Sequence, residues 1–249
     1  QIEKMMKIFA FALALVALTQ AFELSAITKQ GAAARSTSLQ IHPASSEFEC
    51  KVCLSFVDEA LQSLIQIIAN VGIAGGCGTV CGLLPSRTLA TICDIGCEIL
   101  GIEEFSKLLN EVDPDPIYIC EKADFCAHST TAAANVTSVS VNPESGPQGT
   151  EFEIGIAWTT TNEIATGQFE VVIVPPGQGE PFGAASNIML QAPGNYQAGL
   201  KFQANPNEQE PFNPGTYRVQ AVICEGTCGS IHEWSETLSI KMGEFRITQ

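Results

Sequence analysis

The first half of the chain spaces its apolar residues as amphipathic helices do. From Phe48 to Asn70 they return every three or four positions, which predicts one long helix. Pro85 ends the second helix and Ser86 can cap the third, because proline lacks a backbone N–H and a serine hydroxyl accepts one. Five helices are therefore expected, over residues 48–70, 73–84, 86–100, 102–109 and 117–126.

The second half alternates apolar and polar residues between clusters of proline, glycine and asparagine. Such short alternating runs are typical of β-strands in a sandwich. The seven expected strands cover residues 136–141, 152–158, 168–174, 187–191, 196–202, 217–224 and 231–240. Tyr217 is a candidate tyrosine corner of an immunoglobulin-like or fibronectin-like sandwich, and Trp158 is expected between the sheets.

Eight cysteines in the helical half have nested positions. The outside-in pairs are Cys50–Cys126, Cys53–Cys120, Cys77–Cys97 and Cys81–Cys93, and the residue numbers of each pair add to nearly the same total. An antiparallel helical hairpin has this property, since cysteines four apart stack on one helix face. Other connectivities remain open by spacing alone, but nesting favours this one. A redox or zinc role for Cys50 and Cys53 is the weaker alternative, because no strand precedes them.

The remaining cysteines, Cys224 and Cys228, lie where the last two expected strands would meet in a hairpin. We expect them to form a fifth disulfide that rigidifies this turn locally.

The N-terminus indicates export from the cytosol. Residues 1–21 comprise a few upstream residues and a signal peptide, because Met5, Met6 and Lys7 precede an apolar run too short to span a bilayer. No later stretch is expected to span one. The expected divisions after the signal are an N-terminal extension or pro-segment at 22–46, a helical domain at 47–127, a linker at 128–137 and a β-domain at 138–249.

The charge and the single sequon limit the candidate partners. The formal net charge is -15, and both halves carry an acidic excess. Nucleic acid is therefore excluded as a partner, and attraction to anionic membranes is weak unless acidic pH protonates the carboxylates. Asn135 begins the sequon Asn135-Val136-Thr137 and is expected to carry a glycan in a secreted protein.

The chain lacks the residue patterns of a catalytic site. It has three histidines and neither a Gly-x-Ser-x-Gly sequence nor a phosphate-binding glycine loop. We therefore expect no enzyme, no catalytic residues, no cofactor and no metal. His128, just beyond the last cysteine of the helical half, is interpreted as a solvated linker side chain.

The helical half resembles the saposin B-type domain. The resemblance rests on Cys50-x2-Cys53, Cys81-x11-Cys93 and Cys120-x5-Cys126, and the family's first-to-last and second-to-fifth pairing matches the nested order. It implies a lipid-interacting fold of five helices. Cys77 and Cys97 depart from the family and are expected to stiffen the tip of the hairpin. The glycines around the second helix predict that it is short or partly irregular.

The helical half has more apolar residues than one narrow stripe requires. They form either an ordinary core, a homodimer face or a lipid-accepting surface. The lipid-facing candidates are Phe56, Ala60, Leu61, Leu64, Ile65, Ile68, Ile73, Leu83, Leu84, Ile92, Ile99 and Leu108.

The whole layout is similar to countin and countin-like proteins of amoebae, with a β-domain that opens Val141-Asn142-Pro143-Glu144-Ser145-Gly146-Pro147. The resemblance implies a secreted part of a multi-protein counting factor that regulates aggregate size and cell adhesion. The expected fold class is multidomain α + β, a five-helix, disulfide-linked saposin-like domain followed by an immunoglobulin-like or fibronectin-like β-sandwich. Expected partners are a lipid or membrane surface, other secreted proteins, or further copies of the chain. Two alternatives remain, a lipid-transfer or membrane-perturbing protein and a structural subunit of an extracellular assembly.

Overall fold

The helical half consists of five helices. The structure, a computed structural model, describes residues 23–30, 47–109, 115–177 and 179–249, with the backbone alone for 23–30. The helices are α2 (Glu47–Val71), α3 (Gly76–Cys81), α4 (Arg87–Leu100), α5 (Ile102–Leu109) and α6 (Pro116–Lys122). The predicted signal peptide lies outside the described residues.

Local sequence sets where these helices begin and end. The Ser86 hydroxyl accepts the Leu89 N–H at the start of α4, and the Asp115 carboxylate accepts the Tyr118 N–H at the start of α6. Gly101 ends α4 at a φ of 80°, which a residue with a Cβ rarely adopts. The second helix, expected over 73–84, is only six residues long, as its glycines predict.

Helix α2 is the central element of this half. Leu54, Val57, Ala60 and Leu64 lie in its buried face, against the cysteines and the apolar residues of α5 and α6. By length and composition α2 is also apolar enough to cross a membrane. This corrects the expectation that no stretch after the signal peptide would be apolar and long enough to span a bilayer. The residues named here place it as the core helix of the domain.

The second half folds into two sheets around one core. Their strand orders are β1-β7-β4-β2 and β3-β9-β8-β5-β6. The bounds are β1 (Glu23–Gln30), β2 (Ala133–Asn142), β3 (Ser145–Pro147), β4 (Glu151–Asn162), β5 (Ile164–Val174), β6 (Phe182–Gln191), β7 (Gly194–Gln203), β8 (Gly215–Glu225) and β9 (Glu236–Thr248). Trp158 and Tyr217 are buried between the sheets, and the Tyr217 hydroxyl donates to the Asn213 carbonyl, the bond of a tyrosine corner.

Three features of the sheets differ from the sequence expectation. The last strand was expected over 231–240 but begins at Glu236 and continues to Thr248, because residues 231–235 belong to a loop. The short β3 was missed; it pairs in parallel with the end of β9. β2 begins at Ala133, inside the expected linker, and Asn135 lies on it with an exposed side chain.

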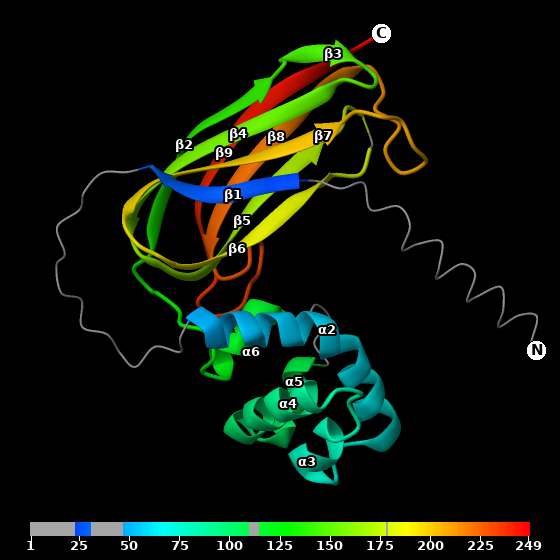
Figure 1. Cartoon of the computed structure of the whole chain (residues 1–249), viewed down its shortest axis with the longest axis vertical. Helices are drawn as coiled ribbons and strands as arrows, with labels where there is room; N and C mark the ends of the chain where they lie inside the picture. Colours follow the sequence, from blue (N-terminus) through cyan, green and yellow to red (C-terminus); the bar gives the residue numbers. More distant parts are fainter. Residues whose placement is uncertain (1–22, 31–46, 110–114, 178) are drawn as a thin grey trace, which may run out of the picture.

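β1 comes from the expected N-terminal extension. It pairs antiparallel with β7 at the edge of the first sheet, so the helices lie between two segments of the β-domain in the sequence. Figure 1 shows the helices below one end of the two sheets, with α2 and α6 nearest to them. The two halves are therefore in contact at that end.

Candidate functional site

Four disulfides join the helices and a fifth lies in the β-domain. The pairs are Cys50–Cys126, Cys53–Cys120, Cys77–Cys97, Cys81–Cys93 and Cys224–Cys228. They are the pairs that the nested spacing and the hairpin position predict, and no cysteine is free. The first two hold α2 to α6 and the residues after it, and the next two hold α3 to α4. Such bonds persist in oxidising compartments, which fits a secreted protein.

The predicted lipid-facing residues divide into three groups. Buried in the helical core are Phe56, Ala60, Leu64, Ile68, Leu84 and Leu108. Partly buried against that core are Leu61, Ile65, Ile73 and Ile92. Exposed are Leu83 at 52% and Ile99 at 50%. In this conformation, most of the apolar surplus thus forms the core, the first of the alternatives left open by the sequence.

The exposed large apolar residues of the helical half lie at the two ends of α2, where Phe48 is 73% exposed, and on α4 and the turn before it. Ile95 and Ile99, 48% and 50% exposed, are four positions apart and therefore share one face of α4. Leu83 lies between α3 and α4, and Val71 ends α2. Ile95 was not among the predicted residues, although the i, i+4 spacing to Ile99 could have indicated it. We call Leu83, Ile95 and Ile99 the α4 patch.

The two halves meet at a seam, defined as the contact between α6 and the β8–β9 loop, residues 226–235. The ring of Tyr118 on α6 stacks on His232 of the loop, with centroids 4.3 Å apart. His128 stacks on Trp234 at 3.9 Å. His128 is exposed, as expected for a linker side chain, but its ring covers the loop. Stacked rings of this kind fix the position of the loop on the helix.

A lysine adds charge to the seam. The Lys122 ammonium lies 4.8 Å from the centroid of the Trp234 ring and 3.5 Å from a Glu233 carboxylate oxygen. A cation over an indole face is attracted by the ring quadrupole. The Glu233 side chain is 62% exposed, so this ion pair contributes little, on the order of 1 kcal/mol or less.

Three carboxyl groups are buried next to the stacked rings. Asp115 accepts from the Thr227 hydroxyl at 2.7 Å, which joins the start of α6 to the loop. Glu225, 1% exposed, ends β8. Glu121, 3% exposed, lies on α6, and neither of its carboxyl oxygens has a hydrogen-bond partner among the described residues. The second oxygen of Asp115 is likewise buried without a partner.

The pKa values of two of these carboxyls are raised. Burial raises the pKa of Glu121 to about 9, and the nearby Glu225 and Asp115 add to the shift. Burial also raises the pKa of Glu225 to about 8, although backbone N–H groups of Ser129, Thr166 and Ala165 donate to it and act the other way. At neutral pH both groups therefore hold a proton in the folded protein.

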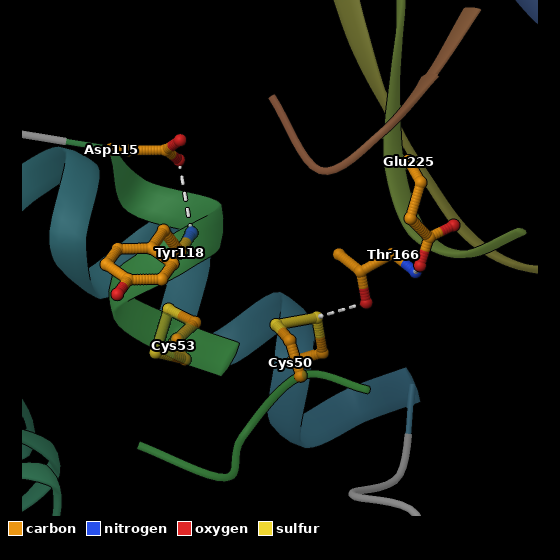
Figure 2. The surroundings of a disulfide bond; sticks show 8 residues. Cys50, Cys53, Asp115, Tyr118, Thr166 and Glu225 are labelled. Carbon is orange, nitrogen blue, oxygen red and sulfur yellow. Dashed lines mark hydrogen bonds between the residues drawn. A yellow bond between two sulfur atoms is a disulfide. The ribbon is translucent and has the colours of Figure 1, made fainter. Parts of the chain in front are cut away.

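The outermost disulfide touches the same region. Figure 2 shows Cys50 beside Thr166 of β5, and the Cys50 sulfur is 3.8 Å from the Thr166 hydroxyl oxygen. Glu225 lies above Thr166 in this view, and Asp115 lies at the start of α6. An open groove of about 450 Å³ lies between the start of α2 and β6, with Lys51, Asn187 and Tyr196 in its wall. The end of the β-domain is thus in contact with the start of α2 as well as with α6.

Sequence reasoning missed the seam. Its polar contacts join residues more than 100 positions apart, and no local pattern carries such information. One weak signal existed, because Glu225 directly succeeds Cys224 at the end of the expected strand 217–224, so it had to lie near a disulfide sulfur. Within the described residues, no group of three or more His, Cys, Asp or Glu side chains is placed to hold a metal.

The comparisons with known proteins agree for both halves. Residues 43–124 match the Countin N-terminal domain family and residues 134–249 the Countin C-terminal domain family. Countin-1 of Dictyostelium discoideum is 44% identical, over 82% of this chain and 79% of its own length. Countin-3 of the same organism is 45% identical, over 82% of this chain and 91% of its own length. Among solved structures, the C-terminal domain of Wzt overlaps 49% of this chain and 81% of its own, with 10% identity and a TM-score of 0.38, which carries no argument.

Proposed function

The chain belongs to the countin family, and from that premise we propose that it is a secreted, non-enzymatic protein that regulates the size of cell aggregates as part of an extracellular assembly. The observation that carries the proposal is the identity of 44% to Countin-1 over most of both chains. The five disulfides and the absence of catalytic motifs from the sequence support secretion and a role by association.

Aggregate size itself provides the test. Purified oxidised protein, added to developing amoebae that lack their own copy, should restore the aggregate size of the parent strain. The same protein after reduction and alkylation is the matched control, because its composition is unchanged and its helices are no longer covalently joined. Equal aggregate sizes with and without the oxidised protein would contradict the proposal.

We further propose that the helical half has a saposin-like fold and meets lipid through the α4 patch. The support is the nested disulfide order and the exposure of Leu83, Ile95 and Ile99 on a domain whose other large apolar side chains are mostly buried. Burial of an exposed isoleucine in a bilayer gains roughly 1 to 2 kcal/mol. The acidic charge opposes anionic membranes, so binding should be stronger at acidic pH.

Liposome flotation tests the lipid proposal. The Ile95→Ser/Ile99→Ser variant should float less than the wild type with neutral vesicles between pH of about 4.5 and 7.5, a range chosen to titrate carboxylates. Ile240→Ser/Met242→Ser is the matched control, because these two residues are equally exposed on β9. If the wild type neither floats nor releases a trapped dye, the lipid proposal fails, and the assembly role is decided by the aggregate-size test alone.

The two alternatives from the sequence have their own readouts. Copurified lipid or dye release by the wild type would favour a lipid-transfer or membrane-perturbing protein. A large native mass of the secreted protein would favour a structural subunit, whereas a monodisperse monomer would count against it.

A further inference from the structure

We propose that the seam between α6 and the β8–β9 loop is a pH-sensitive latch, which holds the helical half against the β-domain in acid and releases it as the pH rises. The inference goes beyond the proposed function and does not depend on it. It rests on where the three buried carboxyls lie, in a contact between two separately cored halves.

The contact brings together acids from both halves. Glu121 and Asp115 come with α6, whereas Glu225 comes with β8. Within the part of the chain that the structure describes, no group donates a hydrogen bond to either oxygen of Glu121, so no donor there compensates a negative charge. A buried carboxylate without a partner is costly, and its protonated form is preferred. Separation of the halves would give these oxygens access to water.

The other charged groups at the seam leave this conclusion in place. They are Lys122 on α6, Glu233 and His232 on the loop, His128 after the last helical cysteine, and Glu163, which adds negative charge near Glu225. The Lys122 ammonium is paired with Glu233 and lies over Trp234.

The direction with pH follows from the raised pKa values. Glu121 titrates at about 9 and Glu225 at about 8 in the docked state, against an ordinary value of 4.5. Docking therefore retains protons that the separated halves release. The docked state is fully favoured below about pH 4.5, and this stabilisation is lost progressively as the pH rises through 8 to 9. Each carboxyl changes the docking constant by at most about tenfold per pH unit in that window.

Hydrogen exchange of the full mature chain tests the latch. Amide protection of α6 and of residues 226–235, corrected for the intrinsic pH dependence of exchange, is measured from about pH 5 to about pH 8.5. Protection of the wild type should fall by at least about tenfold over this range. Protection of β4 and β7 should stay constant, because their core is within the β-domain.

The matched variants are Glu121→Gln and Glu233→Gln. Each removes one acid from the seam, but only Glu121 is buried without a partner. Glu121→Gln should make the pH dependence shallower, because only Glu225 then retains a proton on docking, whereas Glu233→Gln should keep the wild-type slope. If the helical half of Glu121→Gln does not fold, as judged by the α2 and α4 amides, Glu225→Gln serves in its place. Protection of the wild-type seam that varies less than about twofold, or an unchanged slope in the Glu121→Gln variant, would overturn the proposal.

Discussion

The Cys77–Cys97 disulfide joins α3 to α4 outside the shorter Cys81–Cys93 disulfide, and its removal measures how much nested bonds stabilise the helices. It closes a loop with a sequence separation of 20, for which the chain-entropy estimate is about 3 kcal/mol. Cys81–Cys93 already closes 12 of those positions, so the effective loop is shorter. We expect the loss in free energy of unfolding to be about 2.5 kcal/mol.

The variant for this measurement is Cys77→Ala/Cys97→Ala, followed by calorimetry of the oxidised protein. A cost of about 2.5 kcal/mol in a domain of roughly 80 residues lowers its Tm by about 10 to 20 °C. The β-domain transition should stay in place, because its core contains no residue of α3 or α4.

Cys224→Ala/Cys228→Ala is the control. It removes a disulfide of separation 4 in the seam loop and should lower the helical Tm less than Cys77→Ala/Cys97→Ala does, because it closes no loop within the helical half. The reasoning would be refuted by a helical Tm that falls less than about 4 °C, the shift that about 1 kcal/mol produces, in the Cys77→Ala/Cys97→Ala variant.

Three further substitutions test the two cores. Leu64→Ala removes a fully buried side chain from α2 and should cost about 2 to 5 kcal/mol in free energy of unfolding of the helical half, by urea titration followed at 222 nm as a helix signal. Gly183→Ala would place a Cβ 1.8 Å from the Val171 carbonyl oxygen, so we expect loss of amide protection in the β5–β6 pair but not in β2–β4. Trp158→Phe removes the N–H that donates to Gln191 and should lower the β-domain stability by about 1 to 3 kcal/mol, measured by guanidinium unfolding.

Disulfide pairing was predictable because it is a matter of spacing within one helical hairpin. Cysteines four apart, such as Cys77 and Cys81, face the same way on a helix, and their partners Cys93 and Cys97 repeat the interval. The start of α4 at Ser86 is equally local. The hydrogen bond from the Leu89 N–H to the Ser86 hydroxyl spans three residues, so the sequence around Ser86 was sufficient to predict where α4 begins.

The pairing of β1 could not be predicted, although the helices could, because helix formation depends on local sequence. Strand pairing depends on a partner that is far along the chain, and residues 23–30 have their partners between 195 and 201. The start of the last strand was wrongly predicted for a different reason. The alternation of 231–240 suggested a strand, but the loop 226–235 is held on α6 by stacked rings, so packing overrode the local pattern.

An excess of apolar residues in a sequence does not predict which of them will be exposed. Leu83 and Leu84 are neighbours in the sequence, yet one is 52% exposed and the other 7%. Periodicity places residues on a helix face only while the helix continues, and α3 ends at Cys81. The α4 patch therefore required the structure, whereas the core residues of α2 could be predicted from spacing.

The seam also limits what isolated halves of this protein can report. Glu121 owes part of its raised pKa to Glu225 across the contact, and Asp115 of α6 is held by Thr227 of the loop. A helical fragment cut out before β2 would expose Glu121 to water and remove Glu225 from its surroundings, so the pKa of Glu121 would return towards the ordinary range. Lipid binding by such a fragment would then follow the pH dependence of a solvated acidic surface. In the full chain the same pH change first acts on the docking of the two halves.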